Sequence, residues 1–397
     1  MYTAYELEVL MAKVIRLEAN WTNDQPAPVS TRELAIDNLY QALLIDGGRW
    51  LLFSKRDTSG RTSVCDMDSA TGKETNLVQP MDPDETTDVY RFVISVCDNT
   101  PRLSFNLAIA TESIENWRPG TLRMSVWHVA LGTNSETLLA EHITSFNTGH
   151  DAFGDVQIQG NILGYASKNA DGPGYAVHMY RWTKCDLSVQ HVATIRLNGK
   201  RSPDLYLRFL PNQRILVVYR SGAAVYDISE LTFVPATSNC DIESPPSWAM
   251  DFSEPWGPEY INASTTPPEC SSFLITNGTV IYRVVMPQNG PADFQVFDTI
   301  KFVWPSVANL GSRRGLSWEA GGGSSYIELS CLTIPDQEVA VVNLHNSPQY
   351  RSGRGEMPLV RTCRLERRTR LPSTCVNERS GRVFMYSKGF CFVVDFA

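Results

Sequence analysis

The feature that most constrains the fold is a hairpin pattern that recurs along the chain. It is clearest in residues 46–68, where Asp46-Gly-Gly-Arg-Trp50-Leu-Leu-Phe-Ser54 is followed by a polar break and then by Thr62-Ser-Val-Cys65-Asp66-Met-Asp68. A Gly-rich turn before an apolar strand, a reversing loop and a second strand that ends in an acidic turn are typical of an antiparallel hairpin. Weaker copies follow down to the C-terminus, and such repetition indicates a repeat architecture.

Each copy has two recognisable strands. The first strands are expected in residues 50–53, 107–110, 162–165, 215–219, 273–275 and 383–386. The second strands align at Cys65, Trp127, Tyr180, Tyr226, Phe297, Cys363 and Val394. These anchors are about 55 residues apart on average, a period seen in propellers whose loops vary in length. The seven anchors predict seven units, within a range of six to eight, and Arg361-Thr-Cys363-Arg364 is the poorest copy.

Several strands are apolar at consecutive positions, which indicates that both faces are buried. The run Ile215-Leu-Val-Val-Tyr219 shows this best. In α/β proteins, helices cover both faces of such strands, but helix-period patterns nearly vanish from Leu39 onward. Small sheets stacked radially cover one another instead, whereas a two-sheet sandwich would show cleaner alternation. We therefore predict an all-β fold, a seven-bladed β-propeller with a short N-terminal helix.

That helix is predicted for residues 4–20. Its apolar residues recur at spacings of three and four, which is typical of an amphipathic helix; they are Leu7, Leu10, Met11, Val14 and Leu17. Prolines at positions 26 and 28 end the pattern. The polar face is mixed in sign, which favours a packing or linker helix over one that lies on a membrane. We expect residues 1–28 to form this helix and a linker, and residues 29–397 to form the propeller.

Residues 30–38 carry two conflicting signals. Ser30 with Glu33 resembles a capping box and favours a helix, whereas Leu34 and Ile36 alternate with polar residues and favour a strand. The last blade supplies only three strands, in residues 373–377, 382–387 and 390–396. An open backbone edge beside such an apolar strand invites aggregation. We therefore predict a strand in 31–38 that pairs antiparallel with 390–396 and closes the propeller.

Bulk properties limit the classes of partner. The formal net charge of −8 makes the whole chain a poor nucleic-acid binder. No apolar run approaches the roughly 18 residues of a membrane span. The N-terminal residues include two acids and lack a basic region, so we expect no signal peptide. The nine cysteines are scattered without a CxxC pair, which favours free thiols in a reducing compartment, the cytoplasm or the nucleus.

Two stretches resemble known families. The strand ends Tyr226-Asp227 and Phe297-Asp298 are similar to degenerate WD-type repeats. Ile15-Arg-Leu-Glu-Ala-Asn-Trp21, a Pro-containing spacer and Asp46-Gly-Gly-Arg-Trp-Leu-Leu52 together resemble the segment after the F-box in a group of fungal F-box proteins, over about the first 75 residues. The resemblance implies a divergent propeller that recruits substrates to a cullin-type ubiquitin ligase.

The chain departs from that family at the F-box itself. Nothing in this sequence matches its three helices or its Leu-Pro opening, and too few residues precede Trp21 to hold them. The resemblance therefore implies only the substrate-recognition half of such a receptor. We expect no binding of a Skp-type adaptor by this chain alone.

A search for catalytic chemistry yields no motif. Ser54-Lys-Arg-Asp57-Thr-Ser-Gly60 has the residue types of a sialidase Asp-box at the wrong spacing. Asp151 and Asp155, after His150, could serve as a carboxylate pair on a loop, although turn formation is the commoner role of Asp. A Ser-His-Asp triad stays open by composition, but no Gly-x-Ser-x-Gly elbow supports it. We expect no enzyme, no catalytic or metal-binding residue and no cofactor; a glycosidase-like propeller hydrolase and a structural scaffold remain the alternatives.

Candidate partner-binding residues include two tryptophans on expected loops, where rigid scaffolds usually carry recognition, and an arginine doublet. Aromatic residues and arginine are enriched at binding hot spots, and the candidates are Trp117, Arg118, Trp256, Arg313 and Arg314. The arginines between positions 361 and 370 fit a charged edge strand that discourages sheet pairing, with an acidic-partner site as the alternative. We expect a monomer that binds a protein or peptide.

Overall fold

The computed structural model covers the 397-residue chain. It describes residues 4–22, 27–45, 47–56, 60–69, 72–79, 87–97, 100, 102–113, 121–133, 137–151, 155–168, 174–182, 191–198, 205–210, 213–219, 222–229, 234–235, 241–242, 245–251, 271–276, 281–286, 293–297, 306–310, 314–320, 326–333, 359–366, 373–377, 380–387 and 390–396. The chain forms two compact units. Unit 1 contains Phe53–Val64 and Glu74–Pro255, and unit 2 contains Tyr2–Leu52, Cys65–Lys73 and Trp256–Ala397.

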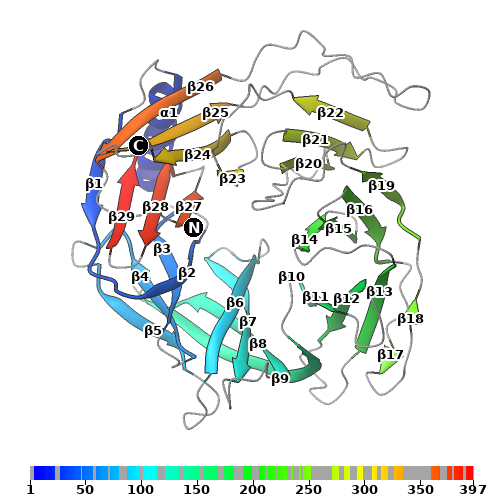
Figure 1. The fold of residues 1–397 in the computed structure, drawn as a ribbon. Helices are drawn as coiled ribbons and strands as arrows, with labels where there is room; N and C mark the ends of the chain where they lie inside the picture. Colours follow the sequence, from blue (N-terminus) through cyan, green and yellow to red (C-terminus); the bar gives the residue numbers. More distant parts are fainter. Residues whose placement is uncertain are drawn as a thin grey trace. The chain divides into compact units, whose positions relative to one another are not determined.

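The described strands form seven sheets, built mostly from strands that follow one another in the chain (Figure 1). The first has the order β2 (Leu39–Leu44), β3 (Trp50–Lys55), β4 (Thr62–Asp66) and β5 (Glu74–Val78). The second is β6 (Thr87–Val96), β7 (Ser104–Ser113), β8 (Thr121–Leu131) and β9 (Leu138–Asp151). The third is β10 (Val156–Gln159), β11 (Ile162–Lys168), β12 (Gly174–Arg181) and β13 (His191–Asn198), and the fourth is β14 (Tyr206–Leu210), β15 (Arg214–Tyr219), β16 (Gly222–Asp227) and β19 (Trp248–Asp251).

The remaining sheets belong to the C-terminal part of the chain. The fifth is β20 (Ser271–Thr276), β21 (Ile281–Met286) and β22 (Asp293–Phe297). The sixth is β23 (Ser306–Leu310), β24 (Arg314–Ala320), β25 (Tyr326–Thr333) and β26 (Leu359–Glu366). The seventh has the order β1 (Ser30–Glu33), β29 (Phe390–Asp395), β28 (Arg382–Ser387) and β27 (Ser373–Asn377). Seven sheets match the seven units predicted from the sequence anchors.

Five of the seven anchors lie in the third strand of their sheet in chain order. A sixth, Val394, lies in β29, which is the third C-terminal strand of the last sheet. Cys363 is the exception, because it lies in β26, the fourth strand of the sixth sheet, and β25 occupies the place predicted for it. The first-strand prediction at 273–275 was also wrong: these residues lie in β20, which pairs with β21, and β21 in turn pairs with β22. In both sheets the apolar pattern is shared by neighbouring strands, so the pattern alone identified a strand but not its place in the sheet.

The predicted closing ladder is confirmed. Strand β1 pairs antiparallel with β29, with Ser30 opposite Asp395 and Glu33 opposite Phe392. The strand is shorter than predicted, because after one more backbone hydrogen bond, from Leu34 N–H to the Cys391 carbonyl, the chain leaves β1. Leu34 and Ile36 are nevertheless buried. Their alternation with polar residues therefore reflects packing that continues beyond the end of the strand.

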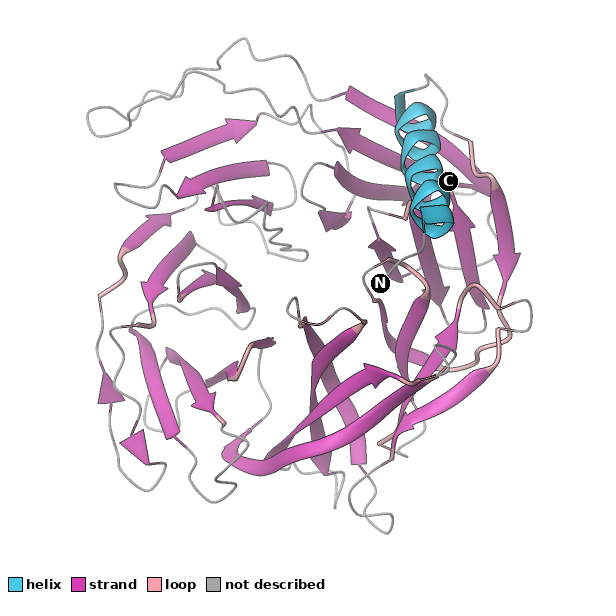
Figure 2. Ribbon diagram, turned by 180° about the vertical axis from the view of Figure 1, so that it is seen from behind, coloured by secondary structure: helices cyan, strands magenta, loops and turns pink. Residues whose placement is uncertain are grey.

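The predicted N-terminal helix is also confirmed, as α1 (Ala4–Thr22). It packs against the end of the seventh sheet, as Figure 2 shows. The assignment of residues 1–28 and 29–397 to separate domains stays a prediction.

The third sheet receives two extra strands from the connection between β16 and β19. Strand β17 (Val234–Pro235) pairs antiparallel with β13, and β18 (Asp241–Ile242) pairs parallel with it. The segment that belongs to the fourth sheet by sequence thus completes the outer edge of the third.

The core of unit 1 lies between its sheets. All five residues from Ile215 to Tyr219 are buried, as their unbroken apolar run predicted. Their neighbours include Phe209 and Gly164, where an added Cβ would lie 3.3 Å from the Phe209 ring. This close approach of β11 to the next sheet explains why glycine occupies that position.

The described residues contain no helix that is long and apolar enough to cross a membrane. They also contain no group of three His, Cys, Asp or Glu side chains placed to hold a metal ion. Within this part of the chain Cys65, Cys97, Cys375 and Cys391 are free thiols. Burial raises the pKa values of the Cys375 and Cys391 thiols to about 12, so both stay protonated and unreactive at neutral pH.

Candidate functional site

The structure leaves most of the sequence-predicted partner-binding residues untested. Trp117, Arg118, Trp256 and Arg313 lie outside the described residues. Arg314 begins strand β24, where its backbone is opposite Thr333. The arginine-rich segment contributes Arg361 and Arg364 to β26, the last strand of its sheet among the described strands, as expected for an edge strand.

Helix α1 is fixed to the seventh sheet through its C-terminal half. Leu17 is 2% exposed and covers Gly381, where an added Cβ would lie 2.2 Å from a Leu17 methyl group. Gly381 also has a φ of +66°, a conformation that glycine adopts without strain. The Asn20 amide donates to the carbonyls of Ala27 (2.7 Å) and Phe396 (2.9 Å), which ties the helix end to both the linker and the end of β29.

The outer side of the same helix is exposed. Met11 and Ile15 are each 64% exposed and Val14 is 41% exposed. Residues at spacings of three and four share one face of a helix, so Met11 and Ile15 lie between the exposed residues Glu8 and Glu18. We call these four residues, with Val14 beside them, the α1 stripe.

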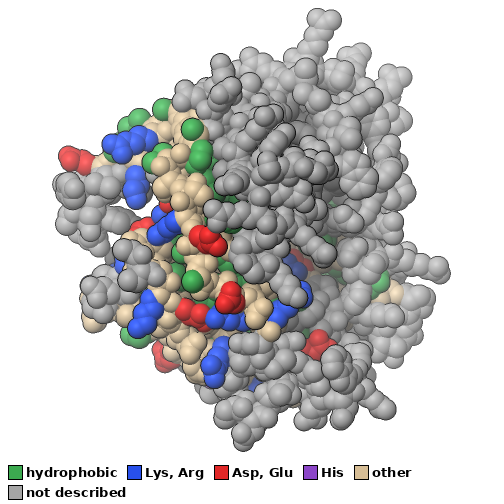
Figure 3. Space-filling model, turned by 60° about the vertical axis from the view of Figure 1, so that its left-hand side comes forward, with side chains coloured by type: hydrophobic (Ala, Val, Ile, Leu, Met, Phe, Trp, Pro, Cys, Tyr) green, Lys and Arg blue, Asp and Glu red, His purple; other side chains and the backbone are tan. Residues whose placement is uncertain are grey.

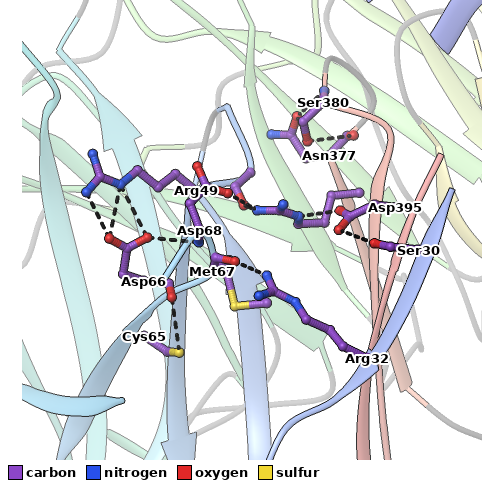
Figure 4. A network of polar contacts seen from close by, with 12 residues as sticks. Ser30, Arg32, Arg49, Cys65, Asp66, Met67, Asp68, Asn377, Ser380 and Asp395 are labelled. Atoms are coloured by element: carbon purple, nitrogen blue, oxygen red, sulfur yellow. Dashed lines mark hydrogen bonds and ion pairs between the residues drawn. The ribbon is translucent and has the colours of Figure 1, made fainter. Parts of the chain in front are cut away.

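A polar network joins the ends of the chain within unit 2 (Figure 4). Its centre is Arg382 on β28, whose Nε lies 2.5 Å from Asp395 Oδ1 and whose Nη1 donates to the Gly48 carbonyl (2.7 Å) and to Asp68 (3.0 Å). Burial alone would lower the pKa of Arg382, but Asp395 and Asp68 hold it above its ordinary value. The guanidinium is therefore a fixed cation that links the last sheet to the turns before β3 and after β4.

Neighbouring contacts extend this network. Arg32 on β1 donates to the Met67 carbonyl, and Ser30 donates to Asp395 (3.1 Å). Arg49 binds the Asp66 carboxylate through Nη2 (2.8 Å) and Nε (3.2 Å). Burial would raise the pKa of Asp66, but the hydrogen bonds from Arg49 and from the turn backbone lower it below its ordinary value.

A second charged network lies in unit 1 and is centred on Asp155, which is 3% exposed and directly precedes β10. Its carboxylate accepts hydrogen bonds from the backbone N–H groups of Val156 (2.9 Å) and Leu207 (3.0 Å) and from Gln157 Nε2 (3.1 Å). Arg91 Nη2 on β6 lies 2.9 Å from its Oδ1. One carboxylate thus ties together the first strands of the second, third and fourth sheets.

Arg208 on β14 is the second guanidinium beside this carboxylate. Burial lowers its pKa, and the Asp155 charge opposes that shift. Among the residues that the structure describes, two guanidinium groups therefore act on this one carboxylate.

Sequence reasoning treated Asp155 as a turn residue or as half of a carboxylate pair. The side chain of Asp151 lies outside the described residues, so the proposed pair is not tested. One recurring sequence signal includes Asp155: an aspartate stands within two residues of the start of the first strand in each of the first four sheets. These residues are Asp37, Asp88, Asp155 and Asp204.

The described part of unit 1 also holds a Ser-His pair. Ser167 Oγ lies 2.8 Å from His178 Nε2, and His178 Nδ1 lies 3.2 Å from Thr194 Oγ1. All three side chains are buried, Ser167 to 1% exposure, on the neighbouring strands β11, β12 and β13. A hydroxyl stands where a hydrolase would place a carboxylate, and a substrate has no access to the serine.

No family model and no curated protein matches this sequence. Among solved structures, a chain of the "Crystal Structure of Mitotic Checkpoint Complex" is similar with a TM-score of 0.52 and 12% identity, covering 94% of this chain and 97% of that one. The fold is that of a β-propeller. The WD40 domain of SCAP from fission yeast (TM-score 0.46, 8% identity, 90% and 84% coverage) and the periplasmic gluconolactonase PpgL of Pseudomonas aeruginosa (0.43, 13%, 91% and 93%) are more distant.

Proposed function

We propose that this protein is a non-catalytic propeller module that binds another protein, and that the α1 stripe is a docking surface for that partner. The observation that carries the proposal is the contrast between the two sides of α1. Leu17 and Asn20 fix the helix to the seventh sheet, while Met11, Val14 and Ile15 face solvent. Large apolar side chains gathered on one exposed face commonly mark an interaction site.

The charges around the α1 stripe define the partner. The exposed Glu8 lies next to Met11 on this face, so a complementary segment offers apolar side chains beside a Lys or Arg residue. An amphipathic helix with this pattern satisfies both demands, since helices commonly recognise apolar surfaces through residues at spacings of three and four. On the described part of the face in Figure 3, Lys and Arg lie intermixed with Asp and Glu, which favours a protein over nucleic acid.

The finer proposal follows the sequence resemblance. This chain acts as the substrate-recognition half of an F-box-type receptor, in the cytoplasm or nucleus, as a monomer that does not bind a Skp-type adaptor by itself. Trp117, Arg118, Trp256, Arg313 and Arg314 remain proposed contributors to partner binding. The similar chain of the mitotic checkpoint complex belongs to a protein complex, which supports a binding role for this fold.

Two local arrangements support a role without catalysis. Asp155 is saturated by four donors and is 3% exposed, so it is a poor general base. Ser167 is buried against His178 and cannot meet a substrate.

The test compares the full chain with the double variant Met11→Ser, Ile15→Ser in affinity purification with quantitative mass spectrometry. The matched control is Lys13→Ser, Arg16→Ser, which changes exposed residues elsewhere on the same helix. We expect one partner to be lost only from the Met11, Ile15 variant, and a peptide of its basic amphipathic segment to bind the purified protein.

Equal recovery of every partner by the two double variants would contradict the docking surface. Light scattering of the purified chain adds a second check, because self-association abolished by Met11→Ser, Ile15→Ser would assign the stripe to a second copy instead. Capture of a Skp-type adaptor by the purified chain would contradict the finer proposal.

A further inference from the structure

The second sheet of unit 1 has an open edge at β9. This strand is 14 residues long, the longest of the described strands, and β8 is its only pairing partner among them. Figure 1 shows β9 at the edge of its sheet. In an antiparallel pair, alternate residues turn their N–H and C=O groups away from the partner strand. The open side of β9 therefore presents a row of backbone donors and acceptors.

The neighbouring third sheet shows how such an edge is completed. Its fourth strand, β13, occupies the same place as β9, and β17 and β18 pair with it from a distant part of the chain. Each of these added strands pairs through two residues only. No strand in the described part of the chain does the same for β9. One edge is thus covered from within the molecule, and the equivalent edge beside it is not.

One stretch of β9 also lacks the usual protection of an edge strand. Natural edges are protected by Pro, by charged side chains, above all Lys, or by bulges. Strand β9 contains no Pro, Lys or Arg. Its pairing with β8 shifts register between His142 and Thr144, which leaves Leu138–His142 as a regular stretch before the shift. Within it Leu139 is 63% exposed, whereas the exposed side chains of the edge strand β5 are polar.

Two exposed side chains of this stretch define the segment that fits the edge. Leu139 and Glu141 are two positions apart and therefore share one face of the strand. Residues directly opposite each other in an antiparallel pair interact, and opposite charges stabilise the pair. A segment with Lys or Arg opposite Glu141 and an apolar residue opposite Leu139 satisfies both side chains.

A second copy of this chain fits the same stretch poorly. Antiparallel self-pairing centred on Ala140 places each Glu141 opposite the apolar Leu139 of the other copy. Self-pairing centred on Glu141 places two carboxylates opposite each other, which is destabilising. The stretch therefore favours a partner of different sequence.

We propose that Leu138–His142 is a strand-addition site for an extended segment of a protein partner, with a basic residue two positions before an apolar one. The basic residue comes first because the added strand runs antiparallel to β9, the more stable of the two pairing directions. Backbone hydrogen bonds supply the affinity in this mode of recognition, and alternate side chains supply the specificity.

This site is separate from the α1 stripe in residues and in unit. The stripe takes an amphipathic helix, and the β9 edge takes an extended segment. Either can fail without affecting the other.

The experiment measures binding of a fluorescent, end-blocked peptide, Thr-Thr-Lys-Thr-Val-Thr-Thr, to the full chain. One control peptide is methylated at every backbone nitrogen, and another carries Glu in place of Lys. We expect methylation to weaken binding about tenfold or more, because it removes the backbone donors. The Glu peptide should bind about threefold or more weakly, because it places like charges opposite each other.

Variants of the chain test the two side chains. Leu139→Ser should weaken binding of the Lys peptide about fivefold, because it removes an apolar contact, and Glu141→Gln should weaken it about threefold. The matched control is Asn147→Ser, which changes an exposed residue of the same strand beyond the register shift and should leave binding unchanged.

Hydrogen–deuterium exchange locates the bound peptide. We expect added protection of the Leu138–His142 amides and none in β16, which belongs to another sheet of the same unit. Equal binding of the methylated peptide, or protection that leaves Leu138–His142 unchanged, overturns the proposal. Light scattering that shows self-association abolished by Leu139→Ser assigns the edge to a second copy and also overturns it. The Met11→Ser, Ile15→Ser variant should bind the peptide normally, which separates failure of this site from failure of the α1 stripe.

Discussion

Arg382 in unit 2 and Asp155 in unit 1 each connect several chain segments, Arg382 through a positive charge and Asp155 through a negative one. Each is a single ion on which several chain segments converge. Arg382 binds two carboxylates and a carbonyl, and its partner Asp68 is 48% exposed. Asp155 binds four donors and is itself 4% exposed in its side chain.

The two centres differ in how well water can solvate the charged partners that remain when the central ion is removed. When Arg382 is removed, Asp68, at 48% exposure, remains accessible to solvent, whereas Asp395, at 16% exposure, is left largely buried. When Asp155 is removed, Arg208 loses the charge that opposes the effect of burial on its pKa, and Arg91, at 35% exposure, loses its ion-pair partner. An uncompensated buried charge is expensive. The cost of losing an ionic centre is therefore set by the burial of the partners it leaves behind.

The largest effect is expected from removing the ladder that Arg382 supports. A chain that starts at Leu39 lacks β1 and exposes the apolar edge of β29. We expect it to lose cooperative thermal unfolding and to aggregate. A chain that starts at Pro28 keeps β1 and loses the burial of Leu17, a loss of about 2 kcal/mol.

Calorimetry of the two truncated chains makes this measurement. Cooperative unfolding of the chain that starts at Leu39 would show that the ladder is dispensable.

Asp155→Asn is expected to have the next largest effect. The substitution keeps the size of the side chain but removes the charge that compensates Arg91 and Arg208. We expect a loss of about 3 kcal/mol in the free energy of unfolding, at the low end for a broken buried ion pair because Arg91 is 35% exposed. Urea denaturation measures it, with Asp227→Asn as a partly buried control in the same unit.

Arg382→Gln tests the other half of the comparison. Its side chain is 12% exposed and makes hydrogen bonds to two carboxylates. We expect a loss of about 2 kcal/mol. Salt should reduce this loss more than that of Asp155→Asn, because the partner Asp68 is 48% exposed and exposed charges are screened more strongly. Equal losses with equal salt dependence would remove the distinction between the two centres.

The smallest effect is expected at the Arg49–Asp66 pair. Because the pKa of Asp66 is lowered in the folded state, its contribution is present above its ordinary value of 3.8 and is lost as the pH falls through the lower folded value. Asp66→Asn should therefore cost less than about 1 kcal/mol at neutral pH, as for other partly exposed pairs. Unfolding curves of the native chain and the variant should converge near pH 2; a constant difference would assign the effect to packing.

Local patterns predicted much of this fold. The hairpin of residues 46–68, helix α1 and the seven-sheet count depend on apolar periodicity and turn residues that are close in sequence. The β1–β29 ladder was predictable because an incomplete last sheet needs one more strand. The place of Cys363 was missed since a strand's position in its sheet depends on pairing partners and not on its own composition.

The charged centres were harder to predict from the sequence, because they too depend on partners that are distant in the chain. Asp155 is separated from Arg91 and Leu207 by tens of residues, and an aspartate before a strand looks like any turn residue. The exposed side of α1 was also hidden: its apolar residues indicated a packing face, and only the structure shows that Leu17 is buried while Met11 and Ile15 are not.

The β1–β29 ladder also sets an order of events during synthesis. Ser30 and Asp395 are 365 positions apart, and β1 leaves the ribosome long before its partner exists. At about 5–20 residues per second, roughly 20 to 70 seconds separate the two strands. Throughout that interval β1, which includes Arg32, lacks its pairing strand β29, and chaperones have access to this segment. The first strand to be made is therefore paired only after translation has passed β29.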